Sequence, residues 1–401
     1  MHNRVAHMAE NIEQTPREST KGGIGEIAAA FLRLGFVAFG GPAAHIALME
    51  DEFVRRRKWL TRERFLDLVG AVSLLPGPSS TELAIYLGQL RGGILGLIAA
   101  GAAFILPSAF LVAGLAWAYL RYGAAPQIAG ILFGVKPVVV ALIAQAVWSL
   151  ARAALKSKEL AFLAVVVVAL AAFRVSTVAL LLGTGVAWIV AQRPGGWRAA
   201  ASAVGNIAAP AATASLAAGG AAIVATSSIL LYFLKVGTVL FGSGYVLLAV
   251  LHADLVVRLH WLTESQLLDA VVVSQATPGP FFTVATFIGY VLAGWKGAAL
   301  ATVGMFLPAF AYVAATATFL PKLRQSPAAA LFLDGVNAAA VALMAFVGFQ
   351  LARVTLLSAP AAVICAISAL LLFRYRINSA WLVLFGAAAG VVSNLLHLAW
   401  Q

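Results

Sequence analysis

The chain alternates long apolar runs with short polar loops. A run of about 20 apolar residues can cross the hydrocarbon core of a bilayer as an α-helix. Runs of this kind cover residues 27–49, 94–120, 127–150, 160–173, 175–192, 354–373 and 377–401, and most of those in the first half have counterparts in the second. The pattern predicts an all-α polytopic membrane protein with about five transmembrane helices in each half.

The second half of the chain repeats the first. At an offset of 202 positions the matched residues are Phe39 and Phe241, Trp59 and Trp261, Pro76 and Pro278, Gly77 and Gly279, and Pro78 and Pro280. After one deletion the offset becomes 201, and it pairs Gly88 with Gly289, Pro107 with Pro308, Gly134 with Gly335, and Gly185 with Gly386. A duplicated hydrophobic unit broken at matched places is typical of transporters whose site lies between two repeats.

These boundaries divide the chain into four parts. A polar N-terminal tail covers residues 1–26 and lacks the apolar core of a signal peptide. The first repeat covers 27–198, an alanine-rich linker or weak extra span covers 199–228, and the second repeat covers 229–401.

Basic residues indicate how the repeats face the membrane, because Lys and Arg accumulate on the cytoplasmic side. Residues 50–67 contain six of them, whereas the equivalent stretch 252–269 contains only Arg258. The bias reverses at the next loop, where Arg121 stands against Lys322 and Arg324. Equivalent loops on opposite sides predict inverted repeats, related by a pseudo-twofold axis in the membrane plane.

Two apolar segments, 67–92 and 269–293, are interrupted by Pro76-Gly77-Pro78 and Pro278-Gly279-Pro280. Proline removes a backbone donor and restrains the preceding residue, so neither segment can be one straight helix. We therefore expect re-entrant or broken helices there. Gly40, Gly41 and Pro42 offer a further break in the first span.

Composition narrows the class of function. Hydrophobic residues make up 62% of the chain and charged residues 10%, with a mean hydropathy of +0.95, against about 25% charged residues in soluble proteins. The net charge of +12 falls in short loops between apolar runs, which favours membrane topology over nucleic-acid binding. One cysteine and six histidines without metal-ligand spacing predict no metal and no cofactor.

Matched basic residues are the first candidates for an anion site. Arg33 and Lys235 both lie six residues before a Phe-Gly pair, within apolar spans. A cation inside a membrane helix costs about 2.5–3.5 kcal/mol on insertion scales, so its presence calls for a role. The alternative is that these long side chains extend to the headgroups.

The segments after each Pro-Gly-Pro are the second candidates. A half-helix starting there would present unpaired N–H groups and the positive end of its dipole to an oxyanion. The residues that would contribute are Gly77, Ser79, Ser80, Thr81, Gly279 and Thr283. The alternative is a proline kink used only for packing.

Further candidates lie elsewhere in the repeats. Lys136 is matched by Asn337, which suggests one asymmetric site shared by the repeats, with a helix-end cation or a structural hydrogen bond as the alternatives for Lys136. Glu82 could couple transport to protons or stabilise a helix N-terminus, and Gln275 could line the second loop or bond a neighbouring helix. For His45 a catalytic role is not expected, since no nucleophile or metal cluster is near it in the sequence.

These motifs resemble the chromate ion transporter family in its long two-domain form. The resemblance rests on Phe39-Gly40-Gly41-Pro42, the run from Glu52 to Arg57, the run from Ser274 to Pro280, and Thr286 to Tyr290, and it extends from about residue 27 to the end. It implies a membrane transporter that expels chromate. The second loop has Gln275 where the first has Ser73, so the two loops are not expected to contribute equally.

Together, residues and resemblance predict a secondary transporter of the bacterial inner membrane that exports chromate by alternating access and confers chromate resistance. Sulfate or other oxyanion uptake or exchange is the alternative, and a membrane-embedded enzyme is a remote one, disfavoured by the lack of an evident catalytic arrangement. The expected partners are the oxyanion and the lipid bilayer, without nucleic acid. The sequence leaves the driving ion and the oligomeric state, a homodimer included, open.

Overall fold

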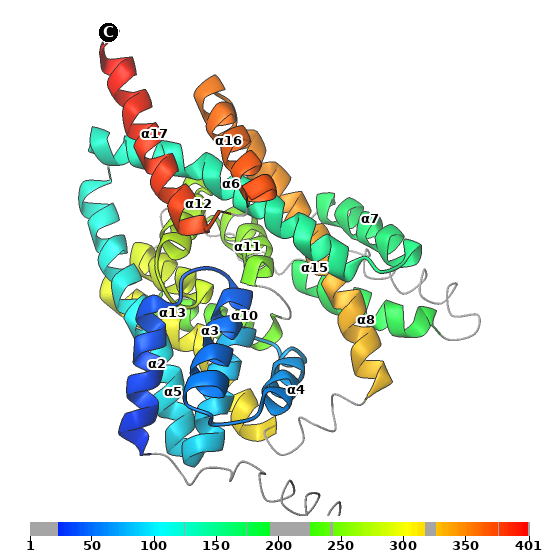
Figure 1. Ribbon diagram of the computed structural model, residues 1–401. Coiled ribbons are helices and arrows are strands. Elements are labelled where there is room, and N and C mark those ends of the chain that lie inside the picture. The colour runs from blue at the N-terminus through cyan, green and yellow to red at the C-terminus, as the bar shows by residue number, and fades with distance from the viewer. Residues whose placement is uncertain are drawn as a thin grey trace, which may run out of the picture.

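The computed structural model describes residues 23–123, 125–173, 175–192, 225–240, 244–316, 326–375 and 377–399, and all regular elements within these residues are helices (Figure 1). Residues 1–22 of the predicted tail and 193–224, with most of the predicted linker, lie outside this part. The first repeat contains α2 (Ile24–Val37), α3 (Pro42–Met49), the π-helix η1 (Glu50–Arg56), α4 (Arg62–Val72), α5 (Ser79–Tyr122), α6 (Pro126–Ala154), α7 (Lys158–Ala172) and α8 (Thr177–Ala191).

The second repeat follows the same order. It contains α10 (Thr226–Val239), α11 (Gly244–Leu251), the π-helix η2 (His252–Arg258), α12 (Glu264–Ala276), the 3-10 helix η3 (Phe281–Thr283), α13 (Val284–Thr316), α15 (Pro327–Thr355), α16 (Ala359–Tyr375) and α17 (Ser379–Ala399). Within the part of the chain that the structure describes, four helices are long and apolar enough to cross a membrane, in α5, α6, α13 and α15, and shorter apolar helices lie in α8, α10, α16 and α17. The chain is therefore a helical protein with several potential membrane spans.

Two predicted spans have different limits in the structure. The run at 27–49, in which Gly40, Gly41 and Pro42 offered a break, contains two helices, because α2 ends at Val37 and α3 begins at Pro42, with Gly40 at a φ of 103° between them. The span predicted to start at 354 is wrong at its N-terminus, since α15 extends to Thr355. The hydroxyl of Ser358 then accepts a hydrogen bond from the N–H of Ala361, which caps the start of α16.

The duplication extends to details of the backbone. Lys58 and His260 follow the two π-helices and share a φ of 51°, which is unusual for residues other than glycine. Thr61 and Thr263 both cap the next helix by accepting from the backbone N–H three residues later.

The long helices α5 and α13 each consist of two helices joined by a tight turn. Gly93 (φ 61°, ψ −147°) and Gly294 (φ 60°, ψ −149°) occupy a region that only glycine adopts readily. We call the parts α5a (79–91), α5b (94–122), α13a (284–292) and α13b (295–316). In each hairpin a matched glycine, Gly88 or Gly289, lies against the backbone of the returning helix, so a Cβ would clash there.

Contacts along α5b give the direction of its neighbours. The position of Gly92 lies against Ile27, and Gly35 lies against the carbonyls of Ala103 and Phe104, so α2 runs parallel to α5b. The hairpin turn makes α5a antiparallel to α5b.

The hairpin of the second repeat lies beside α5b with its direction reversed relative to the hairpin of the first repeat. Ser108 on α5b contacts Thr283 at 3.0 Å, and farther along Tyr119 contacts Phe287 with ring centroids 5.3 Å apart. Hence α13a runs with α5b and against its own counterpart, α5a. The matched hairpins of the two repeats therefore point in opposite directions.

The remaining helices of each repeat pack against helices of the other repeat. Helix α6 packs along α17 and α16, whereas α15 packs along α8 and α7. A Cβ on Gly134 would clash with the carbonyl of Gly386, and one on Gly335 would lie 2.7 Å from the carbonyl of Thr184 and 2.9 Å from the Cα of Gly185. Small residues permit such close helix crossings. Reciprocal contacts between matched positions are what a twofold relation between the repeats produces.

Candidate functional site

Three helix starts from both repeats meet at one pocket. The pocket is small and partly open to solvent. Its walls are formed by Gly40, Pro42 and His45 at the start of α3, Pro78, Ser79 and Ser80 at the start of α5, and Pro280, Phe281 and Phe282 at η3. We call this the break pocket. The predicted helix breaks of the two repeats thus lie together, although they are about 200 residues apart in sequence.

The sequence explains why helices start there with free N–H groups. Pro42 is in the first turn of α3, and Pro78 and Pro280 are extended residues that immediately precede α5 and η3. No side chain caps any of these three starts. The first N–H groups of a helix have no partner within it, so three positive dipole ends face the pocket. No acidic side chain is among the residues that line it.

His45 joins the walls of the break pocket. Its side chain is 2% exposed, its Nδ1 lies 3.3 Å from the Ser80 hydroxyl, and its Nε2 lies 3.1 Å from the carbonyl oxygen of Ala38. The same carbonyl accepts a hydrogen bond of 2.8 Å from the backbone N–H of Gly279. This network connects the break after α2, the start of α5 and the second Pro-Gly-Pro loop, and the sequence alone gave no reason to expect it.

The two Pro-Gly-Pro loops pack against each other's repeat. Gly279, at a φ of 99°, lies so close to Ser108 that an added Cβ would be 2.6 Å from the Ser108 Cβ. Gly77, at a φ of 142°, faces Ala309 in the same way, with an added Cβ 3.9 Å from the Ala309 Cβ. Ser108 and Ala309 occupy matched positions, so the contacts are reciprocal.

The exchange of serine for alanine makes the site asymmetric. Ser108 shares a hydrogen bond of 3.0 Å with the Thr283 hydroxyl, whereas Ala309 offers none to Thr81. The Thr81 hydroxyl and both carboxyl oxygens of Glu82 are buried without a hydrogen-bond partner among the described residues. The Glu82 carboxyl lies against Gly77, behind the wall of the break pocket.

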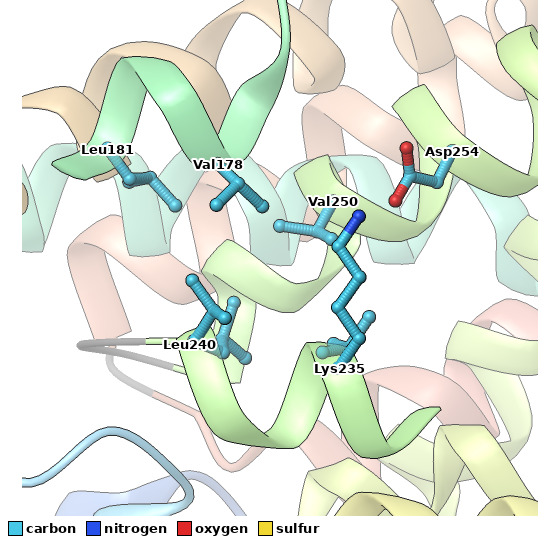
Figure 2. A pocket seen from close by; sticks show the side chains of 8 residues that line it. Val178, Leu181, Lys235, Leu240, Val250 and Asp254 are labelled. Carbon is cyan, nitrogen blue, oxygen red and sulfur yellow. The ribbon is translucent and has the colours of Figure 1, made fainter. Parts of the chain in front are cut away.

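The matched cations face matched acids rather than the break pocket. Arg33 lies 4.0 Å from Glu52, whose other oxygen binds Arg57 at 2.7 Å. Lys235 extends toward Asp254 (Figure 2). Asp254 also forms an ion pair of 3.0 Å with Arg258. A second pocket surrounds them and is lined by Val178, Leu181, Lys235, Val236, Val239, Leu240, Val250 and Asp254.

Lys136 belongs to a different cluster between the repeats. Its Nζ lies 3.1 Å from the carboxylate of Asp269 and 2.7 Å from the Ser265 hydroxyl. Tyr119 donates to the other oxygen of Asp269 at 3.0 Å. Asn337 is half-buried in α15.

Of the remaining predicted residues, Gln275 is buried near the end of α12. Gly41 precedes α3, and Pro76 and Pro278 flank the loops without lining the break pocket. Gly40, Pro42, Pro78, Ser79, Ser80 and Pro280 are the predicted residues that line it.

Residues missed by sequence reasoning had a signal in the repeat. Glu52 and Asp254 are separated by 202 positions, as are Asp67 and Asp269. Matched acids could therefore have been paired with the matched cations. No comparable signal exists for His45, because Leu247 takes its place in the second repeat. No group of three His, Cys, Asp or Glu side chains that could hold a metal occurs in the described part of the chain.

Comparison with known proteins agrees with the duplicated architecture. The family described as "Chromate transporter" matches residues 25–189 and again 227–391. The chain is 33% identical over 371 residues to the chromate transport protein of Cupriavidus metallidurans, covering 92% of each chain. It is 35% identical over 298 residues to that of Pseudomonas aeruginosa, covering 72% of this chain and 71% of the relative.

A probable chromate transport protein of Synechococcus elongatus is 32% identical over 292 residues, covering 70% of this chain and 72% of the relative. No solved structure matches the chain. The double family match and the extent of these alignments show that the chain belongs to the chromate transporter family.

Proposed function

We propose that the protein is a secondary transporter of the bacterial inner membrane that exports chromate by alternating access and thereby confers resistance to it. The break pocket is the proposed oxyanion site. The observation that carries this proposal is the convergence of three uncapped helix starts, from both repeats, on a pocket without an acidic wall.

The pocket suits a tetrahedral dianion for electrostatic reasons. Each helix start carries roughly half a positive charge, and each such end stabilises an anion by about 0.3–1 kcal/mol, or up to about 2 kcal/mol when partly buried. Ser79 adds a hydroxyl donor, and Gly40 lets an oxyanion approach the backbone. Together these groups replace the hydration of the anion without a metal or cofactor.

The proposed inverted arrangement is supported by the directions of the helices. Lys58 adjoins Trp59, whose ring lies 5.2 Å from Arg91 at the end of α5a, next to the turn that leads into α5b. His260 precedes α12, whose Asp269 binds Tyr119 near the other end of α5b. From Ile94 to Tyr119 a helix spans about 38 Å, more than the roughly 30 Å hydrocarbon core. Rocking one hairpin pair against the other would open the break pocket to one side at a time.

We propose a supporting role for the matched cations. Arg33 and Lys235 lie on α2 and α10, the helices that end next to the breaks. The charges of Arg33 and Lys235 raise the positive electrostatic potential on the route to the pocket. Lys136 and Asn337 occupy matched positions on α6 and α15. Glu82, directly behind Gly77, is the proposed additional protonatable group.

The membrane potential favours the proposed direction. Moving one charge through 100 mV changes its free energy by about 2.3 kcal/mol, so a dianion leaving a negative interior gains about twice that amount.

Counterflow in inverted and right-side-out vesicles tests the function. Radiolabelled chromate should accumulate in inverted vesicles and be displaced by unlabelled chromate. Arg33→Ala and Lys235→Ala should each lower the rate at least tenfold, which corresponds to about 1.4 kcal/mol. Arg55→Ala, at an exposed position paired with Glu50, is the matched control and should transport at the parent rate. Parent rates in both test variants, at normal expression, would contradict the assigned roles.

Sulfate exchange is the second candidate function, since a pocket of backbone N–H groups recognises the charge and shape shared by tetrahedral oxyanions. Sulfate would then drive chromate counterflow as well as chromate itself does. Weak competition by sulfate, molybdate and phosphate would favour a dedicated chromate exporter.

A further inference from the structure

His45 is placed where a single proton could change the polarity of the break pocket. It is buried, lines the pocket, and hydrogen-bonds both Ser80 and Ala38. Leu247 occupies the matched position in the second repeat, so this arrangement occurs in the first repeat only.

The acceptor at Ala38 fixes the tautomer of the neutral ring. A carbonyl oxygen can only accept, so the Nε2 atom at 3.1 Å must carry a hydrogen. In the neutral ring Nδ1 is then an acceptor, and the Ser80 hydroxyl donates to it across 3.3 Å. Ser80 consequently spends its only hydrogen on His45 and turns oxygen lone pairs toward the pocket, which repels an anion.

We propose that His45 takes up a proton on Nδ1 each time an oxyanion enters the break pocket, so that proton and anion bind together. The Nδ1–H then donates to the Ser80 oxygen, and the Ser80 hydroxyl hydrogen turns to the anion. The same proton gives the ring a positive charge beside the anion. This inference rests on the proposed function and names the device by which its site recognises a dianion.

The surroundings of His45 make this binding cooperative. The groups that face the ring are the Ala38 carbonyl, the backbone of Gly40, the Ser80 hydroxyl and the edge-packed ring of Phe104, with Phe281 and Phe282 across the pocket. None of them carries a charge. A buried cation without a counter-ion is costly, and an anion in the pocket supplies that counter-ion.

Most charged groups on neighbouring elements are paired elsewhere, and the exception is Glu82, whose carboxyl has no hydrogen-bond partner among the described residues. On α5, the Glu82 carboxyl lies against Gly77. On η1, which packs against α3, the ion pairs are Glu50 with Arg55, Asp51 with Arg56, and Glu52 with Arg57, and Arg33 of α2 also faces Glu52. Within the described residues no ion pair involves His45. The affinity of the pocket for the anion and the affinity of the protein for the proton are therefore linked mainly through this ring. The linkage is reciprocal, since each ligand raises the affinity for the other by the same factor.

Proton uptake on binding tests the inference directly. The purified protein in weakly buffered detergent solution is titrated with sulfate, whose dianion takes up no proton near neutral pH, and with chromate, while a pH indicator reports protons. We expect up to one proton taken up per sulfate bound, and an apparent Kd that rises up to tenfold per pH unit where His45 is neutral. Binding without proton uptake, with a Kd independent of pH, would overturn the inference and leave the proposed function intact.

Variants separate His45 from other titratable groups. His45→Gln keeps a donor for the Ala38 carbonyl but cannot titrate. Sulfate should therefore bind this variant more weakly, with a Kd that is independent of pH and without uptake or release of a proton. His252→Gln, at an equally buried histidine beside Glu264 and away from the pocket, should retain the parent proton uptake. Undiminished uptake in His45→Gln would assign the proton to another group, such as Glu82, and would overturn the inference.

Ser80→Ala provides a second test should His45→Gln fail to fold. It removes the hydroxyl that the proton reorients, and sulfate affinity should fall about tenfold at every pH while proton uptake continues. Parent affinity in Ser80→Ala would overturn the inference. A folded parent protein that binds neither sulfate nor chromate would instead contradict the proposed function itself.

Discussion

Replacing Gly279 by alanine should disrupt the junction between the repeats. Gly279 has a φ of 99°, and its N–H donates to the Ala38 carbonyl across 2.8 Å. An added Cβ would lie 2.6 Å from the Ser108 Cβ, closer than two carbon atoms can approach without movement. The substitution therefore strains the backbone and pushes the second Pro-Gly-Pro loop away from α5b.

The cost can be bounded from two terms. Holding a residue with a Cβ in a sparsely populated backbone region costs about 1–3 kcal/mol, and overpacking a close contact costs about 1–3 kcal/mol. Even the lower sum, about 2 kcal/mol, lowers the population of the closed junction roughly 30-fold. Loss of the hydrogen bond to Ala38 would add about 0.5–1.5 kcal/mol.

Chromate counterflow and thermal unfolding in detergent measure the effect. Gly279→Ala should slow counterflow at least tenfold and lower the melting temperature. Gly114→Ala is the matched control, because it lies in α5b with open space around an added Cβ and should be neutral or stabilising by up to about 1 kcal/mol. If Gly279→Ala had the counterflow rate and the melting temperature of the parent protein, this junction between the repeats would be refuted.

Three further predictions concern single positions. Lys136→Met leaves Asp269, 2% exposed, without its cation and should destabilise the protein by about 3–5 kcal/mol, whereas the double variant with Asp269→Leu should recover part of that loss in thermal unfolding. Gly335→Val should lower the melting temperature by opening the crossing of α15 and α8, and an unchanged value would mean that this crossing is looser than the structure has it. Glu82→Gln should reduce the response of chromate transport to an imposed proton gradient while counterflow persists; an unchanged response would limit Glu82 to packing against Gly77.

The sequence predicted the parts of the fold that depend on local chemistry. Proline restricts the backbone and glycine permits conformations that other residues avoid, so the interruptions at 76–78 and 278–280 were visible without coordinates. The matched glycines were visible too, and the structure explains them. Gly134 meets Gly386, and Gly335 meets Gly185, at the crossings between the repeats.

Tertiary contacts account for what the sequence did not predict. Gly40, Gly41 and Pro42 offered a break in 27–49, but the exact limits of α2 and α3 depend on Gly40 adopting a positive φ, which sequence alone does not show. The limits of α15 and α16 fall within a continuous apolar stretch, where periodicity gives no boundary.

The candidate site was predicted in part for the same reason. Ser79 and Ser80 were identified because they follow a Pro-Gly-Pro break, and both line the break pocket. His45 was passed over, since its partners Ala38 and Ser80 are brought to it only by the fold. The roles of Arg33, Lys235 and Lys136 as anion ligands stay predictions.

The opposite directions of the matched hairpins are the basis of the proposed transport cycle, and cysteine labelling tests them most directly. Lys58→Cys and His260→Cys, both at exposed turns, are introduced separately after Cys365→Ser has removed the single native cysteine. A membrane-impermeant maleimide should label one variant in right-side-out vesicles and the other only in inverted vesicles. Labelling of both variants from the same side would contradict the inverted arrangement.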